Sequence, residues 1–202
     1  MSAVKKPKYT LEEYLTLDRN SDERLEYWAG EIFSMSGVSK EHARIEINLS
    51  ARLDLLLDTS GCQVFPANMR IKVPSLPPYR YADLSALCGE ALYEQIEGVD
   101  VLVNPALIIE ILSDSTEGFD RGDKFSHYKF IPSFQEYLLV AQRRPHVTQF
   151  IKQAGNTWLQ HEFNDLTDTL KLVSLGCELP LRGIYRGLVF PLNPVASNAP
   201  TD

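Results

Sequence analysis

The chain has 202 residues, of which 44% are hydrophobic and 23% charged, enough to form one folded domain with a full core. Its formal net charge of −7 argues against a surface that binds nucleic acid non-specifically throughout, because phosphate affinity comes mainly from Lys and Arg. We expect a single domain over residues 1–190. Residues 191–202 are polar and contain Pro and Asn, which predicts a disordered tail.

The cysteines and the apolar runs bear on where the protein is found. Cys62, Cys88 and Cys177 are odd in number and form no CxxC pair, so we expect neither a disulfide framework nor a zinc site. No apolar run reaches the ~18 residues that a membrane span needs. Residues 1–8 do not resemble a secretory signal. We therefore expect a cytoplasmic protein with no membrane partner.

The first part of the chain predicts a helix, a hairpin and a second helix. Thr10 with Glu13 three residues later is a capping box, which opens a short helix. Residues 24–35 predict a β-hairpin, although the Ala29 at its centre fits a type I′ turn poorly. Ser39 can cap a second helix, because apolar residues recur after it at spacings of four, four and three.

The second part predicts strands interrupted by one helix. This order indicates an α/β (α+β) fold with a central mixed sheet, flanking helices and a C-terminal β meander. The predicted elements are strands over residues 69–73, 81–88, 106–112 and 136–141, a helix over 119–130, and the meander from 146 onward.

Glu110 lies in the middle of an apolar, β-branched segment that is typical of a strand buried on both faces. A buried carboxylate costs several kcal/mol unless a partner compensates its charge. One interpretation is a divalent cation shared with Asp83, which interrupts the preceding strand, and two such carboxylates suit Mg²⁺ or Mn²⁺. The alternatives for Glu110 are a buried ion pair or an orientation toward solvent at a sheet edge, and the alternative for Asp83 is a turn-capping role.

Asp120, Lys124 and Tyr128 lie four residues apart, on one face of the helix that follows. A helix packed back on the strand would bring Lys124 to the two carboxylates, where it could position water and offset negative charge. The alternative for Lys124 is an exposed salt bridge with Asp120, the commoner fate of a helical lysine.

Three further residues are weaker candidates. Glu26 lies in the hairpin, where carboxylates are usually solvated, and His42 lies in the first turn of its helix, where capping is commoner than catalysis. Arg70 could contact phosphate, although it also fits the wet face of its strand. The histidines show no zinc-hydrolase spacing, and GxxxxGK[ST], GxGxxG and GxSxG are absent.

Several motifs together resemble the Uma-type family of restriction endonucleases, part of the PD-(D/E)xK nuclease superfamily. The motifs are Tyr81-Ala-Asp83, Glu110-Ile-Leu-Ser113, Ser115-Thr116, Asp120-Arg-Gly-Asp-Lys124 and Tyr128, within a resemblance over about residues 9–140. Ala82 stands where the family usually has Pro. Leu112 occupies the usual lysine position, and the lysine moves to the next helix as Lys124.

The resemblance implies a restriction-endonuclease-like core and Mg²⁺-dependent hydrolysis of phosphodiester bonds in DNA, with duplex as the expected substrate. Asp83 and Glu110 would hold the metal, with the carbonyl of Ile111 as a further ligand, and Lys124 would assist the attacking water. Two alternatives stay open: an inactive nuclease-fold module that binds nucleic acid or protein, and a hydrolase of another phosphate ester. Because cutting two strands needs two sites, a homodimer through the meander is also expected.

Overall fold

A computed structural model describes residues 8–35, 37–96 and 98–190, so the predicted tail lies outside the described residues. The helices are α1 (Leu11–Asn20), α2 (Lys40–Leu57), α3 (Glu117–Phe119), α4 (Phe125–Tyr128) and α5 (Leu181–Ile184), and a π-helical segment, η1 (Asp120–Lys124), joins α3 to α4. The strands are β1 (Leu25–Trp28), β2 (Glu31–Ser34), β3 (Cys62–Pro66), β4 (Arg70–Lys72), β5 (Tyr79–Tyr81), β6 (Leu84–Cys88), β7 (Tyr93–Ile96), β8 (Val99–Leu102), β9 (Leu107–Leu112), β10 (Glu136–Ala141), β11 (Val147–Lys152), β12 (Trp158–Phe163), β13 (Thr169–Leu172) and β14 (Cys177–Pro180).

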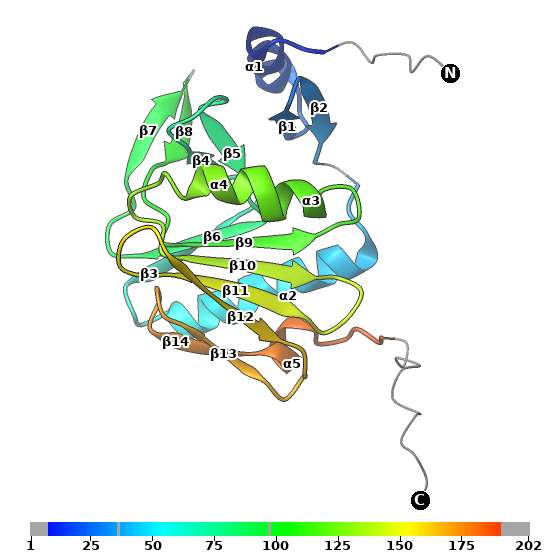
Figure 1. Cartoon of the computed structure of the whole chain (residues 1–202), viewed down its shortest axis with the longest axis vertical. Helices are drawn as coiled ribbons and strands as arrows, with labels where there is room; N and C mark the ends of the chain where they lie inside the picture. The colour runs from blue at the N-terminus through cyan, green and yellow to red at the C-terminus, as the bar shows by residue number, and fades with distance from the viewer. Residues whose placement is uncertain (1–7, 36, 97, 191–202) are drawn as a thin grey trace, which may run out of the picture.

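The central sheet has six strands in the order β12-β11-β10-β9-β6-β3. Strands β9 and β10 are parallel, and their other neighbours are antiparallel, so the sheet is mixed as predicted. A smaller sheet, β5-β4-β8-β7, and the hairpin β1–β2 lie beside it. Figure 1 shows α3 and α4 along one side of the central sheet, while α2 passes behind it.

Strand β9 is buried along its whole length, which confirms the prediction of a central strand. Its side chains alternate between two cores. Leu107, Ile109 and Ile111 join the apolar cluster that contains α2, whereas Ile108 and Leu112 join the cluster that contains Phe125 and Tyr128 of α4. Glu110 therefore faces the side of the sheet that η1 and α4 cover.

The predicted strand over residues 81–88 is wrong in its continuity. Tyr81 ends β5 in the small sheet, and Leu84 begins β6 in the central sheet. The chain passes from one sheet to the other between them, so Asp83 lies at this crossing and not inside a strand. The apolar pattern of the sequence does not reveal this crossing, because the residues before and after Asp83 are both buried.

The predicted hairpin is present, with Leu25 paired to Ser34 and Trp28 paired to Glu31. Ala29 adopts φ 53° and Gly30 adopts φ 89°. Both central residues thus have the positive φ that type I′ turns require, even though an alanine rarely adopts it. Packing of the hairpin against the rest of the protein overrides this local preference.

The C-terminal meander divides into two parts. Strands β11 and β12 extend the central sheet, whereas β13 and β14 form a separate hairpin. Leu170, Leu172 and Leu179 of that hairpin are buried in the same cluster as the α2 side chains. Much of the apolar content that suggested a dimer interface therefore belongs to the core of the chain itself.

The expectation that no cysteines pair is wrong. Cys62 of β3 and Cys88 of β6 are direct partners in the antiparallel register, and they form a disulfide. Cys177 is free. Spacing along the chain could not reveal the pair, because only the pairing of β3 with β6 brings the two residues together.

Among the helices of the described part of the chain, none is long and apolar enough to cross a membrane. The cytoplasmic setting stays a prediction, and the disulfide runs against it because reducing compartments rarely maintain such bonds.

Candidate active site

Glu110 projects from β9 toward η1 and α4, and its side chain is 2% exposed. Lys124 Nζ lies 3.0 Å from its Oε1, and the Tyr128 hydroxyl donates a hydrogen bond of 3.0 Å to the same oxygen. Burial raises the pKa of Glu110 well above its usual range, although the charge of Lys124 opposes this shift. The carboxylate that was anomalous in the sequence thus has two partners.

Asp83 is held from two directions at the crossing between the sheets. The backbone N–H of Ile111 donates to Oδ2 at 2.6 Å, and His42 Nε2 lies 3.1 Å from Oδ1. His42 is in the first turn of α2, where Ser39 accepts a hydrogen bond from its backbone N–H. The helix start and strand β9 together fix the orientation of this carboxylate.

His42 is buried at 7% exposure and so does not lie on the surface. Burial lowers the pKa of His42, but the hydrogen bond and charge of Asp83, aided by Glu46, outweigh burial and raise it overall. The imidazole can therefore carry a proton while it contacts Asp83.

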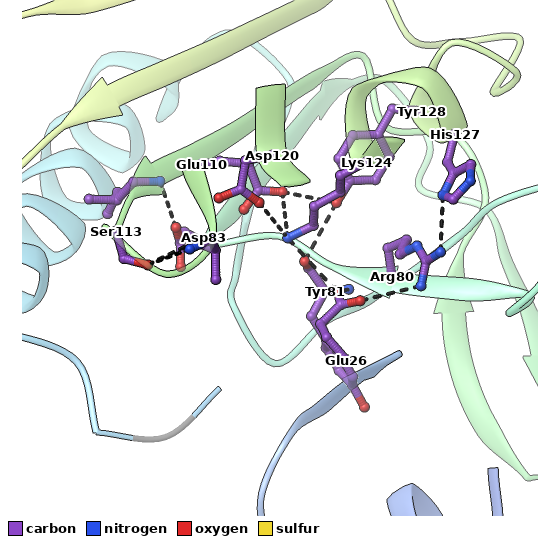
Figure 2. A network of polar contacts seen from close by, with 12 residues as sticks. Glu26, Arg80, Tyr81, Asp83, Glu110, Ser113, Asp120, Lys124, His127 and Tyr128 are labelled. Atoms are coloured by element: carbon purple, nitrogen blue, oxygen red, sulfur yellow. Dashed lines mark hydrogen bonds and ion pairs between the residues drawn. The ribbon is translucent and has the colours of Figure 1, made fainter. Parts of the chain in front are cut away.

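Lys124 lies at the centre of an acidic cluster, and Figure 2 shows the side chains of Glu26, Glu110 and Asp120 directed toward its ammonium. The distance from Nζ is 3.0 Å to Glu110, 3.5 Å to Asp120 and 3.9 Å to Glu26. Burial alone would lower the pKa of Lys124, but these three carboxylates raise it. Lys124 is therefore held in its protonated form and is unsuited to accepting a proton.

The segment η1 gives Lys124 this inward position. Its backbone follows α3 and precedes α4, and Asp120 and Lys124 at its two ends are both buried. Tyr137 of β10 donates a hydrogen bond of 3.0 Å to the backbone oxygen of Asp120. Single π-helical turns occur often at functional sites. The pair of Asp120 and Lys124, for which an exposed salt bridge was the alternative interpretation, is buried.

Glu26 reaches the cluster from the hairpin and is buried, in contrast to the usual solvated hairpin carboxylate. Its Oε1 accepts a hydrogen bond of 2.7 Å from the backbone N–H of Tyr81, and Arg80 lies 3.4 Å from Oε2. Burial raises the pKa of Glu26, while Lys124 and Arg80 oppose the shift. Glu26 thus connects the hairpin to the site.

Arg70 does not join the site. Its guanidinium lies 2.6 Å from Asp18 Oδ2, and its Nε donates to the Tyr81 hydroxyl at 2.7 Å. These contacts tie β4 to α1, which makes Arg70 a structural residue and not a solvated or phosphate-facing one.

A cavity of about 280 Å³ opens onto the site. Asp83, Glu110 and Lys124 all line it, together with Asp120 and His42. The residues that complete its wall are Arg24, Ser34, Met35, Gly37, Val38, Ser39, Glu46, Ile111, Ser113, Ser115, Thr116 and Gln142.

Gln142 is a wall residue that sequence reasoning missed. It directly follows β10, where Ala141 pairs in parallel with Leu112 of β9. Ligand sites in α/β sheets gather at the carboxyl ends of parallel strands, so a polar residue at this position was a usable signal. Arg24, Ser39 and Glu46 were also missed as wall residues, and they come from segments that only the tertiary fold brings here.

The donors at the site fit a hard divalent cation. Asp83 and Glu110 supply two carboxylates to one cavity. Since the N–H and C=O of a strand residue point to the same side, the Ile111 carbonyl faces the side on which its N–H meets Asp83. Mg²⁺ takes one or two carboxylates and keeps several waters. Over the described ranges, no cluster of three or more His, Cys, Asp or Glu side chains forms a metal site, so water would complete the coordination.

Sequence comparisons find relatives that match most of the chain. The model of the Uma2 family, described as "Putative restriction endonuclease", matches residues 11–182. "Uncharacterized protein slr1290" from Synechocystis sp. is 33% identical over 184 residues, covering 91% of this chain and 95% of the relative. "Uncharacterized protein sll1609" from the same organism is 35% identical over 153 residues, covering 76% of this chain and 86% of the relative.

A solved structure shares the fold. It is a crystal structure described as "a putative nuclease belonging to DUF820" from Anabaena variabilis. The TM-score is 0.67 at 17% sequence identity, and the match covers 87% of this chain and 97% of that one. At this identity the likeness shows the architecture, a restriction-endonuclease-like mixed sheet with flanking helices.

Proposed function

Because the chain belongs to the Uma2 family, a family of nuclease type, we propose that it is a divalent-metal-dependent DNA endonuclease. One observation carries the proposal: Asp83, Glu110 and Lys124 line a single cavity, in which Lys124 Nζ lies 3.0 Å from Glu110. Asp83 and Glu110 would hold Mg²⁺ or Mn²⁺, with the carbonyl of Ile111 as a further ligand.

A cation bound there supplies an activated water and offsets negative charge on the phosphate. The residues of the chain do the remaining work. Lys124 offers an ammonium to a phosphate oxygen, while Asp120 and Glu26 keep it charged and directed into the site. His42 and the N–H of Ile111 hold Asp83 in place, and Tyr128 holds Glu110.

The first test is a calorimetric titration of Mn²⁺ into the wild-type protein and into Asp83→Ala and Glu110→Ala. We expect the wild type to bind and both variants to lose binding, because each removes one of two carboxylate ligands. Glu12→Ala is the matched control, since Glu12 is an exposed carboxylate on α1 that does not line the cavity, and it should bind as the wild type does.

Cleavage of a supercoiled plasmid with Mg²⁺ completes the test. The two site variants should lose cleavage and the control should keep it. If the wild type binds no metal at millimolar concentration, either alone or with an uncleavable duplex present, the metal-dependent endonuclease proposal is wrong.

A second candidate is a catalytically inactive module that binds nucleic acid or protein. The net charge of −7 favours the protein-binding form of this module, because an acidic chain is a poor partner for a polyanion such as nucleic acid. Full cellular function after Asp83→Ala would support this candidate. Comparing duplex DNA, RNA and nucleotides as substrates under one Mg²⁺ condition separates the remaining alternative, a hydrolase of another phosphate ester.

A further inference from the structure

The catalytic cavity continues beyond its own wall. Ser39, Ser115 and Gln142 also border a neighbouring hollow, which reaches Asp114 and Arg143. Gln142, Arg143 and Asp114 in turn border a third hollow. Gln142 lines all three, so the hollows form one depression that runs from the site past the carboxyl end of β10. Figure 1 shows the ends of β9 and β10 and the start of α3 at the same end of the sheet.

Three arginines line the outer part of this depression, together with the carboxylates of Glu41, Asp114 and Glu117. Arg143 and Arg144 lie in the turn between β10 and β11, and Arg121 lies in η1. Arg143 pairs with Asp114, with both side chains more than 70% exposed, and Arg121 pairs with Glu117 at 2.7 Å. Arg144 forms no ion pair with any residue that the structure describes.

Exposed ion pairs of this kind contribute little stability, so a stronger anion can replace the carboxylates. A phosphate accepts paired hydrogen bonds from a guanidinium, which makes it a suitable competitor. The arginine-lined part is therefore a surface that fits a row of phosphates leading away from the site.

Gln142 joins the two parts of the depression. Its side chain is buried, and Ser39 donates a hydrogen bond to its Oε1. That contact fixes the carboxamide with its two N–H donors on the other side. Within the described residues, Nε2 has no hydrogen-bond acceptor, although Gln142 is only 9% exposed and borders the catalytic cavity. Nε2 itself is not fully buried, so this donor pair is free to bind an acceptor on a ligand in the cavity.

We propose that Gln142, Arg143, Arg144 and Arg121 bind the backbone phosphates of the DNA strand beside the cleaved bond. Gln142 donates to the phosphate next to the scissile one, and the arginines bind the phosphates that follow. This inference rests on the proposed nuclease function for the choice of substrate, and it makes these four positioning residues for that substrate.

The test measures binding of a fluorescein-labelled 20-base-pair duplex by anisotropy, with Ca²⁺ in place of Mg²⁺ and over a series of salt concentrations. Arg143→Ala and Arg144→Ala should each weaken binding about tenfold and reduce the slope of log K against log salt by about one. Arg182→Ala is the matched control, because Arg182 is an exposed arginine on α5 outside the depression, and it should bind as the wild type does.

Gln142→Met tests the donor pair without adding a negative charge that would itself repel phosphate. Methionine keeps the length of the side chain but removes both N–H donors, so we expect about tenfold weaker binding. In a cleavage assay it should raise KM and leave kcat nearly unchanged, with an unaltered melting temperature.

Asp83→Asn distinguishes this inference from the nuclease proposal, since it should abolish cleavage and keep binding. If no protein cleaves DNA but the groove variants lose binding, the groove stands and the endonuclease proposal fails. If the wild type does not bind duplex, or if the groove variants bind as tightly as Arg182→Ala, the groove inference is overturned, whatever the cleavage assay shows.

Discussion

Glu110 is one residue for which two interpretations turned out to be compatible. From the sequence, its interpretations included a metal ligand and half of a buried ion pair, beside a solvent-facing position at a sheet edge. In the structure it pairs with Lys124 at 3.0 Å, and it also lines a cavity beside Asp83. The ion pair keeps an otherwise costly buried carboxylate ionisable, and the cavity leaves it accessible to a cation.

Replacing Lys124 tests how strongly the acidic cluster depends on it. Lys124→Met leaves Glu26, Glu110 and Asp120 without their shared cation, and breaking such a buried pair costs about 3–5 kcal/mol of unfolding free energy. Adding Glu110→Gln to that variant should restore part of the loss. Urea denaturation of both single variants and the double variant gives the coupling energy.

Arg121→Ala is the control for that cycle. It breaks the i,i+4 pair with Glu117, in which both side chains are at least one-third exposed. It should change the unfolding free energy by no more than about 0.5 kcal/mol. Equal losses for Arg121→Ala and Lys124→Met would contradict the cluster's dependence on the buried lysine.

At the scale of elements, two periodicities decide the site. The two-residue period of β9 turns Glu110 toward the helical side, while Ile109 and Ile111 face α2. The helical spacing of Asp120, Lys124 and Tyr128 places all three in the buried face that meets it, and η1 keeps both of its end residues inward. A shift of one residue in β9 or in η1 would turn Glu110 or Lys124 to the opposite side and separate the two side chains.

The disulfide between β3 and β6 should stabilise the fold, because it links two neighbouring strands covalently. It closes a loop of 26 residues in sequence separation, so removing it should lower the unfolding free energy by about 3.5 kcal/mol in the chain-entropy account. The variant is Cys62→Ala with Cys88→Ala, measured by urea denaturation with and without dithiothreitol. Its stability should not depend on the reductant, whereas that of the wild type should fall. A wild type that is insensitive to dithiothreitol would contradict the disulfide.

At the scale of the whole molecule, the described chain presents the Asp83–Glu110–Lys124 constellation once, and under the endonuclease proposal two copies are needed to cut both strands in one encounter. We therefore propose a two-fold homodimer. The meander was the expected interface, and although β13 and β14 contribute to the core, β12 lies at the open edge of the central sheet. Leu159 on β12 is 47% exposed, which makes this edge the remaining part of the meander suited to an interface.

Sedimentation velocity at micromolar concentration should show a dimer for the wild type. Leu159→Lys should shift it to monomer, because a charge would be buried at the pairing edge. Leu76→Lys is the control, since Leu76 is 73% exposed outside the meander, and it should remain dimeric. A monomeric wild type would sink the homodimer proposal.

Taken by itself, the sequence determined what local patterning encodes. The hairpin, the α2 helix, the buried strand with its misplaced carboxylate and the mixed α/β architecture each follow from periodicity, caps or turn residues within a short window. The family resemblance came from motifs in order and is borne out by the match over residues 11–182. These features depend on neighbours along the chain, which is why they can be read there.

Only the tertiary structure decided what depends on distant segments. The break at Asp83 arises where the chain changes sheets, and the Cys62–Cys88 pair arises from strand register. Glu26, His42 and Gln142 reach the site from separate segments, and Arg70 is drawn away from it by Asp18. Burial and partner choice are set by which elements pack together, and no local window of sequence contains that information.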